Sequence, residues 1–360
     1  MTASIPGNKQ LMDLLFRDAD EHGKEMLSKA QCQQLIREFG GQSSAYFNLQ
    51  SDVQRFGVPD IGFITYAPVK TFFGRVNIVF ANPVCQSRMR FWLLKEFTSR
   101  VPGRFVFSGI DGDTARDLGS LGFSTTEMGS EFSVRIPGFS VAGRRKKQLR
   151  HAANLGKRHD IRVLEQTAEE VDLDQVREIS EKWRHHKNVK HHELRLLTRP
   201  PVLEDEWGVR KFYAYQGGRL LGCVFFDPFF EQGRVIGYTA NILRQDMDNS
   251  PSSLLDYIIL TAMERFREED IELLSLGIAP LYDVHARPGD NPMVRRTCQF
   301  LYEYANNFYA FKSLSYHKTR YRGEETKWYL ASRDTPALKV AWSMLRGTGI
   351  LGRPSIGFPQ

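Results

Sequence analysis

The first 140 residues alternate between segments of helical and of strand periodicity. Apolar positions recur at helical spacing over 9–39, with Leu11, Leu14 and Leu15 on one stripe, and the same spacing predicts helices over 87–99 and 113–121. Short runs rich in β-branched and aromatic residues, bounded by glycine, proline and aspartate, predict strands instead. These runs are AYFNL at 45–49, GFITYA at 62–67, RVNIVF at 75–80, FVFSGI at 105–110 and the alternating stretch 131–136.

The second half repeats this order of elements. A helix predicted over 168–187 precedes the predicted strands KFYAY, LLGCVFF and RVIGYTA, and a long helix over 252–268 and a strand over 271–276 follow. Helix, three antiparallel strands, helix and strand thus occur twice, which predicts two copies of one α/β (α+β) unit with mixed, mostly antiparallel sheets. The predicted division is an N-terminal helical segment at 1–38, a first domain at 39–140, a basic connection at 141–165, a second domain at 166–335 and a tail at 336–360.

Composition places the chain among ordinary globular proteins. It has 360 residues, of which 41% are hydrophobic and 25% charged, enough for two domains. The longest apolar runs, such as 220–226, fall far short of the ~20 residues of a membrane-spanning helix, and residues 1–10 carry no secretory signal. The cysteines are far apart and without CxxC pairs, which predicts reduced, buried thiols of a cytoplasmic protein. They are Cys32, Cys85, Cys223 and Cys298.

The net charge of +7 is unevenly distributed along the chain. Cationic residues gather in a basic segment at 144–158, which indicates contact with a polyanion, either nucleic acid or anionic lipid; a solvated helix face is the alternative. The cations of the basic segment are Arg144, Arg145, Lys146, Lys147, Arg150, Lys157 and Arg158. Two histidine pairs, at 185–186 and 191–192, lack the spacing of a metal site, so no metal is predicted.

The twofold order of elements resembles the GNAT acyltransferases, whose central strands separate to admit an acyl donor. Five segments resemble, more narrowly, the soluble C-terminal catalytic region of lysyl- and alanyl-phosphatidylglycerol synthases. In that family a tandem GNAT region moves an amino acid from aminoacyl-tRNA onto a phospholipid. The multi-span membrane half that usually precedes the region has no counterpart in this sequence, so lipid flipping is not expected. The segments are FGGQSSAYFNL at 39–49, 122–161, 238–257, LSLGIAPL at 274–281 and 308–331.

The resemblance assigns the amino-acid pocket to the stretch YTANILRQDMDNSPSSLLDY at 238–257. The family carries an Asp-x-x-Arg element where this chain has Asn241 and Arg244. Neutral Asn241 can only hydrogen-bond an ammonium group, so the amino acid that is transferred stays open, and Asp246 or Asp248 could restore a carboxylate. The loop before the helix has no glycine to bring backbone amides close to a pyrophosphate, which disfavours coenzyme A as the donor.

Further site residues follow from the same resemblance. Asp256 matches an acidic position of the family helix, although a first-turn aspartate also complements a helix dipole. The backbone amides near Gly277 could stabilise an oxyanion, with a strand end as the alternative. Tyr316, Lys318 and Arg320 alternate as in a strand, which places both cations on one face toward the tRNA terminus or a lipid phosphate. The predicted substrate-binding residues are Asn241, Tyr238, Gly277, Lys318, Arg320 and Glu324.

The working hypothesis is an aminoacyl-tRNA-dependent aminoacyltransferase of the cytoplasm, visiting the inner membrane face, that needs no cofactor. Its second GNAT-like domain is catalytic, with Arg244, Asp248 and Asp256 as catalytic residues; the general base stays open among Asp248, Asp256, Glu324 and His317. The acceptor is phosphatidylglycerol, as the resemblance implies, or a soluble hydroxyl or amine. The alternatives are a coenzyme A-dependent N-acyltransferase and a non-catalytic protein that binds RNA or lipid.

Overall fold

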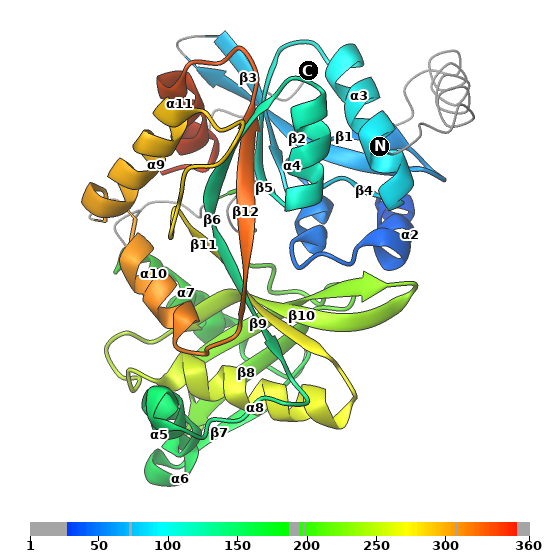
Figure 1. The fold of residues 1–360 in the computed structure, drawn as a ribbon. Helices are drawn as coiled ribbons and strands as arrows, with labels where there is room; N and C mark the ends of the chain where they lie inside the picture. Colours follow the sequence, from blue (N-terminus) through cyan, green and yellow to red (C-terminus); the bar gives the residue numbers. More distant parts are fainter. Residues whose placement is uncertain (1–26, 72–73, 187–194, 197–198, 307–308, 351–360) are drawn as a thin grey trace.

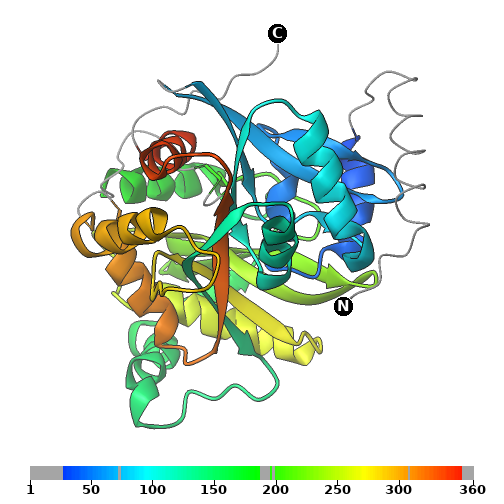
Figure 2. The same cartoon turned by 45° about the horizontal axis from the view of Figure 1, so that its top comes forward.

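The structure is a computed structural model that describes residues 27–71, 74–186, 195–196, 199–306 and 309–350. One twelve-stranded, mostly antiparallel sheet runs through the molecule, and helices pack around it (Figures 1 and 2). This confirms the predicted α/β class with a mixed sheet. Within the described residues, no helix combines the length and apolar composition needed to cross a bilayer.

Each copy of the predicted unit contains a helix, three antiparallel strands, a helix and a strand parallel to the third. The first copy consists of α2 (Lys29–Phe39), β1 (Gln54–Val58), β2 (Gly62–Thr71), β3 (Gly74–Phe80), α3 (Arg90–Arg100) and β5 (Arg104–Ile110). The second consists of α7 (Leu173–His185), β8 (Arg210–Gln216), β9 (Arg219–Glu231), β10 (Arg234–Gln245), α8 (Leu254–Glu268) and β11 (Leu273–Pro280). The tandem GNAT-like order is therefore present.

The two copies exchange their last strands. β6 (Ser124–Arg135) follows the first copy but pairs with β11, with Val134 opposite Leu274. β12 (Glu324–Ser332) follows the second copy but pairs with β5, with Ala331 opposite Phe107. β6 and β12 also pair with each other, so the sheet continues from one copy into the other. With β7 (Ile161–Glu165) at the far edge, the strand order is β1-β2-β3-β5-β12-β6-β11-β10-β9-β8-β7, and the twelfth strand, β4 (Val84–Cys85), pairs with β2 outside this order.

Three further helices follow one another along one side of the molecule in both views (Figures 1 and 2). They are α9 (Pro292–Tyr304), α10 (Phe311–Thr319) and α11 (Ala337–Gly347), the last within the predicted tail.

The basic segment forms η3 (Arg144–Lys146), α5 (Lys147–Ala153) and α6 (Leu155–His159), and α5 packs on α8. The remaining elements are η1 (Ala45–Leu49), η2 (Ser87–Met89) and α4 (Gly112–Ser120).

Two predicted strands are wrong. AYFNL forms the short helix η1, because the Asn48 amide donates to the Ala45 carbonyl and its oxygen accepts from Thr65, contacts that hold a turn. Lys318 lies on the helix α10, so its alternation with Tyr316 and Arg320 does not reflect a strand. Lys318 is buried while Tyr316 is exposed, because helical spacing turns them to different faces. The predicted helix over 9–39 is described only from residue 27, where α2 confirms its end.

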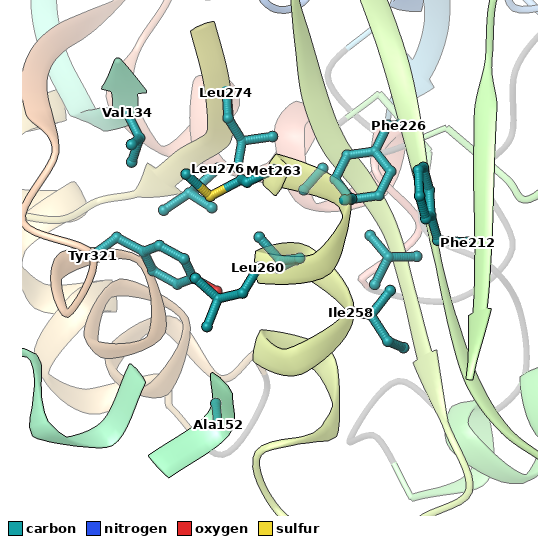
Figure 3. Packing of buried hydrophobic residues seen from close by; sticks show 14 of the residues in the cluster. Val134, Ala152, Phe212, Phe226, Ile258, Leu260, Met263, Leu274, Leu276 and Tyr321 are labelled. Atoms are coloured by element: carbon teal, nitrogen blue, oxygen red, sulfur yellow. The ribbon is translucent and has the colours of Figure 1, made fainter. Parts of the chain in front are cut away.

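The largest core surrounds α8 and fixes it against the sheet (Figure 3). Phe212 and Phe226 approach α8 from β8 and β9, and Tyr321 approaches from the segment after α10. Each fully buried aromatic or aliphatic side chain stabilises the fold by roughly 1.5–3 kcal/mol through removal of apolar surface from water. A rigid α8 is what holds Asp256 in place beneath the sheet.

The four cysteines are buried and free, as predicted. Burial raises the pKa of Cys85, Cys223 and Cys298 to about 12, because the thiolate would lose its hydration. Thiolates are the reactive form, so these thiols have a packing role.

Candidate functional site

The parallel strands β10 and β11 separate in the second copy. They pair from Gly237 to Thr239 of β10, opposite Leu273 to Ser275 of β11, and the ladder ends there. The equivalent pair β3 and β5 of the first copy continues over 76–80. Register shifts at Ala240–Ile242 and at Ser275–Ile278 coincide with the end of the ladder and redirect both strands. The split between β10 and β11 is therefore a property of the second copy.

Lys318 reaches β11 beside this split from helix α10. Its Nζ donates a 2.7 Å hydrogen bond to the carbonyl of Ile278, and only 8% of the residue is exposed. Gly277 has a φ of +75°, and a Cβ there would lie 3.2 Å from Nζ, so the glycine both makes the bulge and leaves room for the amine. Burial lowers the pKa of Lys318 to about 7, although the nearby Glu131 carboxylate raises it. An amine with this pKa can give or take a proton near neutral pH.

Asp256 on α8 is buried and anchors the end of α10. Arg320 Nη2 lies 2.5 Å from one carboxylate oxygen, and the Tyr321 hydroxyl donates to the other at 2.8 Å. His317 lies 3.6 Å from the same carboxylate and contacts Arg320. Burial raises the pKa of Asp256, and the Arg320 and Tyr321 contacts lower it in part. The structure thus brings Asp256, Arg320 and His317 together, in a cluster that positions the helix carrying Lys318.

Arg244 lies buried on β10, in the part of the strand beyond the split. Its guanidinium stacks over the Trp183 ring of α7 at 4.3 Å, and Nη1 donates to the Leu243 carbonyl at 3.1 Å. A planar, weakly hydrated guanidinium is the cation best suited to stacking on an aromatic ring. Trp183 lies within the helix predicted over 168–187, and its contact with Arg244 depends on the packing of α7 against β10, a strand distant in sequence.

The loop between β10 and α8 is organised by its own carboxylate, Asp246. Asp246 accepts hydrogen bonds from the backbone amides of Asp248 and Asn249 and from the Asn249 side chain, and it pairs with Arg219 at 2.8 Å. Burial raises the pKa of Asp246, but these hydrogen bonds outweigh it and hold the pKa below its usual range. Two amides of the loop before α8, those of Asp248 and Asn249, are thus directed at Asp246 and not at a bound anion. Asp248 itself is exposed, with His186 at 3.7 Å.

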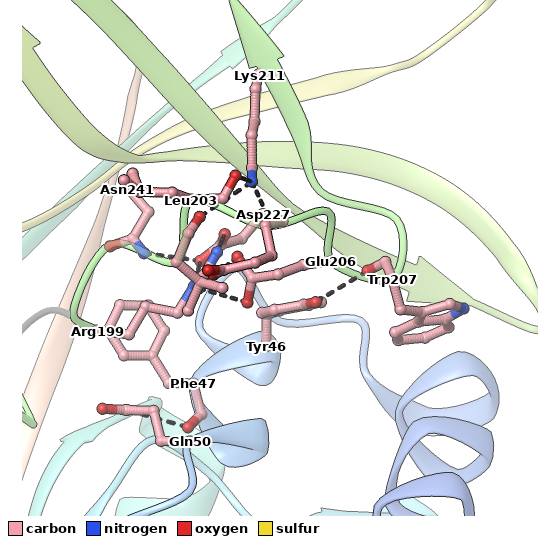
Figure 4. A network of polar contacts seen from close by, with 12 residues as sticks. Tyr46, Phe47, Gln50, Arg199, Leu203, Glu206, Trp207, Lys211, Asp227 and Asn241 are labelled. Atoms are coloured by element: carbon pink, nitrogen blue, oxygen red, sulfur yellow. Dashed lines mark hydrogen bonds and ion pairs between the residues drawn. The ribbon is translucent and has the colours of Figure 1, made fainter. Parts of the chain in front are cut away.

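Asn241 belongs to a network of charged side chains that reaches β10 from the neighbouring strand β9 and the segment 199–206 (Figure 4). Its side-chain amide donates to the Asp227 carboxylate at 2.8 Å. Arg199 holds the same carboxylate through two hydrogen bonds, of 2.6 and 2.9 Å, and Glu206 through two more of 2.8 and 2.9 Å. Arg199 also lies over the Tyr46 ring, 5.0 Å from its centroid. A carboxylate therefore stands beside Asn241, supplied by the neighbouring strand β9.

Replacing Asn241 by aspartate is expected to destabilise the protein by roughly 1–3 kcal/mol at pH 8, because a hydrogen bond to a buried carboxylate is lost and two carboxylates then meet. The pKa of one carboxyl would rise in the folded variant. Its proton restores the hydrogen bond, so the loss should shrink as the pH falls to 5. Urea unfolding of both proteins at the two pH values measures this; an equal loss at both would contradict it.

The remaining predicted residues are spread over the structure. Tyr238 packs in the core, stacked on Phe266 at 4.6 Å. Glu324 forms an exposed ion pair with Arg135 at 2.9 Å on β12. In the basic segment, Lys146 and Arg150 bond backbone carbonyls of 140–143 and are partly buried. The other five cations of the segment are exposed: Arg144, Arg145, Lys147, Lys157 and Arg158.

Two groups of residues near the site escaped the sequence prediction. Arg199, Glu206 and Asp227 form the buried network beside Asn241, and Glu131 faces Lys318 from β6. The sequence signal for Asp227 is a carboxylate within an otherwise apolar strand, 220–230, which requires a buried partner.

Among the described residues, no cluster of three or more histidine, cysteine or acidic side chains could hold a metal ion; His191 and His192 lie outside those residues.

Comparison with known proteins connects this geometry to a family. The profile of the family described as "Phosphatidylglycerol lysyltransferase, C-terminal" matches residues 33–332. The phosphatidylglycerol lysyltransferase of Bacillus subtilis is 20% identical over 326 residues, which are 88% of this chain and 36% of that protein. The chain thus spans about a third of that relative's length.

Two solved structures share the fold. The C-terminal domain of a putative lysylphosphatidylglycerol synthetase from Agrobacterium fabrum gives a TM-score of 0.72 at 19% identity, over 92% of this chain and 100% of that one. L-PGS from Bacillus licheniformis gives 0.70 at 17% identity, over 88% and 94%. Because the family profile spans most of the sequence, this chain belongs to the phosphatidylglycerol lysyltransferase C-terminal family.

Proposed function

We propose that the chain is an acyltransferase that moves an amino acid from aminoacyl-tRNA to the hydroxyl of a phosphatidylglycerol-like lipid. The observation that carries the proposal is the split between β10 and β11, which occurs in the second copy and has the buried amine of Lys318 beside it. The Bacillus subtilis relative is named a phosphatidylglycerol lysyltransferase, which supports this acceptor.

The proposed reaction is the displacement of one oxygen ester by another. The acceptor hydroxyl attacks the carbonyl carbon of the aminoacyl ester, and the bond to the tRNA ribose oxygen breaks as the new ester bond forms. The hydroxyl loses a proton and the ribose oxygen gains one, so no cofactor is consumed. Lys318 is the group we assign to this proton, because its pKa of about 7 suits both directions. Arg244 provides positive charge for the oxyanion of the tetrahedral intermediate.

The loop geometry favours an aminoacyl ester over an acyl-coenzyme A as the donor. Coenzyme A would need free backbone amides between β10 and α8, whereas those of Asp248 and Asn249 donate to Asp246. The exposed cations of the basic segment suit the phosphates of the tRNA instead. We place the reaction at the inner membrane face, where charged tRNA and lipid headgroups meet, through peripheral contact.

Transfer of radiolabelled amino acid from charged tRNA to phosphatidylglycerol tests the proposal. The wild-type protein is expected to form an aminoacylated lipid that mass spectrometry identifies, with no requirement for coenzyme A. Arg244→Ala should lower the transfer rate at least roughly a hundredfold, the cost of removing one oxyanion donor, and keep its circular dichroism spectrum.

The matched control is Arg234→Ala, an exposed arginine at the start of the same strand, which should leave transfer unchanged. Equal rates for wild type and Arg244→Ala would contradict the role of Arg244. Absence of any aminoacylated lipid with lysyl-, alanyl- and other aminoacyl-tRNAs would contradict the proposed reaction.

A further inference from the structure

Exposed apolar side chains gather on three neighbouring helices. Nine large apolar residues are exposed among the described residues, and six of them lie on α9, α10 and α11. On α9 they are Met293, Phe300 and Tyr304, spaced so that one helix face carries all three; on α11 they are Leu338 and Trp342, one turn apart. We call these five residues the outer helix face.

The side chains of the outer helix face are too exposed to belong to the margin of the hydrophobic core. Met293 is 61%, Tyr304 73% and Leu338 77% exposed, although each stands in a regular helix. Phe300 and Tyr304 contact each other with ring centroids 4.9 Å apart, and α9 packs against α11. Two helices that pack together therefore each carry exposed apolar side chains, and apolar surface of this kind marks an interaction site in soluble proteins.

An apolar cavity lies directly behind the outer helix face. It contains about 670 Å³ of unfilled space, including its open mouth. Val294 and Leu301 line it from α9, and Val340 and Met344 line it from α11. The same two helices are thus apolar on the inside and on the outside, a property of helices that meet an apolar medium on both faces.

The net charge of these helices indicates which kind of surface they would bind. The side chains of α9, α10 and α11 that are not buried include four cations, Arg295, Arg296, Lys312 and Arg346, and the carboxylate Glu303. Lys312 pairs with Glu303 and Arg295 with Asp290, so the net positive charge rests on Arg296 and Arg346. Apolar residues with tryptophan and tyrosine, flanked by arginine, are the composition of helices that lie in the headgroup region of anionic bilayers. A protein groove would need its own acidic rim, whereas an anionic bilayer supplies this charge everywhere.

We propose that the outer helix face docks on the surface of an anionic phospholipid bilayer. The inference rests on the proposed lipid acceptor and specifies how the chain approaches it. Helix α10, which carries Lys318 and ends just before Arg320, lies next to α9 along the same side (Figures 1 and 2). Docking there brings the helix of the candidate site to the lipid headgroups.

Sedimentation with vesicles tests the docking surface without requiring any transfer. The purified chain is mixed with vesicles of phosphatidylcholine alone or with phosphatidylglycerol added, and the bound fraction is measured. The wild type is expected to bind the anionic vesicles, and the triple variant Phe300→Gln/Leu338→Gln/Trp342→Gln to bind them at least roughly tenfold more weakly. The control Leu164→Gln, which changes an exposed leucine of β7 elsewhere on the molecule, should bind like the wild type.

Quenching by lipids brominated in their acyl chains gives a second readout. The wild type should lose tryptophan fluorescence on binding, and Trp342→Phe should lose most of that quenching, because Trp342 is the exposed tryptophan of the face. Vesicle binding by the triple variant as tight as that of the wild type would overturn the proposal. So would a dimer of the free wild type that the triple variant abolishes while neither binds vesicles.

A soluble short-chain phosphatidylglycerol separates this inference from the proposed function. If the docking surface is right, the triple variant transfers to the soluble lipid at the wild-type rate and to vesicles far more slowly. If the proposed reaction is wrong, no variant transfers to either acceptor, yet the vesicle-binding difference persists. Equal transfer to vesicles by wild type and triple variant would refute the docking surface alone.

Discussion

Replacing Lys318 by methionine is expected to lower the rate of aminoacyl transfer by roughly 10²–10⁴-fold, the contribution typical of a positioned proton donor or acceptor. Methionine fills a similar volume, so the bulge at Gly277 and the packing of α10 on β11 can persist. The substitution removes only the amine next to the Ile278 carbonyl, which is the group proposed to carry the proton. Single-turnover transfer from charged tRNA to phosphatidylglycerol, with circular dichroism as the check on folding, measures the effect.

The same substitution should change how stability depends on pH. The folded-state pKa of Lys318, about 7, lies well below the ordinary value of about 10.5. Between these values the unfolded chain holds a proton that the folded chain has released, so this group makes the free energy of unfolding rise with pH across that window. Over the whole window the rise amounts to roughly 5 kcal/mol, at about 1.36 kcal/mol per pKa unit. Below pH 7 both states are protonated and the cost of the buried charge is constant.

Lys318→Met should therefore be more stable than the wild type at pH 6 and lose this advantage toward pH 9.5. Urea unfolding at intervals of pH gives the difference between the two proteins, in which all other titrating groups cancel. Lys312→Met, on the same helix but exposed and paired with Glu303, should follow the wild-type curve. Parallel curves for Lys318→Met and the wild type would show that the amine is not buried as the structure has it.

The repeated unit could be predicted from the sequence because its strands and helices have distinct periods. Strand 220–226 is continuously apolar and helix 252–268 is amphipathic. The helix was predicted within two residues of its observed bounds, whereas the observed strand extends five residues further, to Glu231. The exchange of β6 and β12 could not be predicted, because an alternating strand pattern does not specify which neighbour completes the ladder. The split of β10 from β11 was implied by the resemblance, and the structure adds the three-residue ladder that defines it.

The candidate site contains buried charged residues, and these cannot be predicted from the pattern of polar and apolar positions. Phe311, Ser315 and Lys318 are buried and lie one turn apart on the core face of α10. Because a lysine occupies this face, the helical pattern of apolar positions is hidden and the segment resembles an alternating strand. Asp256 and Arg320 were both expected near the site, but their ion pair across 64 positions of sequence could not be read locally. Arg199 and Asp227 likewise meet only through the fold. The roles of Arg244, Asp248, Gly277 and the basic segment remain predictions.

Replacing Arg199 by methionine is expected to have the largest effect on stability, a loss of roughly 3–5 kcal/mol at pH 7.5. Asp227 is fully buried and takes two of its hydrogen bonds from Arg199, and Glu206 takes two more. Burial raises the pKa of Glu206 even with Arg199 present, and Arg199 lowers it in part. Without the guanidinium, two carboxylates would stand together in the interior with one hydrogen bond from Asn241.

The pH dependence of this loss identifies its cause. In Arg199→Met the pKa of the Glu206 carboxyl, which burial already raises, should rise further because the guanidinium that lowers it is gone. The variant therefore gains stability relative to the wild type as the pH falls and this carboxyl binds a proton. The difference from the wild type should then be smallest near pH 5 and largest above pH 7. Adding Asp227→Asn removes one buried charge, so the double variant should recover part of the loss, whereas independent sites would give additive losses.

A surface ion pair supplies the matched comparison. Arg265→Met breaks exposed contacts with Glu268 and Glu269 and should cost no more than about 1 kcal/mol at any pH. If Arg199→Met were equally mild, or its loss were the same at pH 5 and pH 7.5, Arg199 would be acting through packing rather than charge. A large loss that is rescued by Asp227→Asn would instead establish the buried charge pair as the contact that ties the segment 199–206 to β9, next to Asn241.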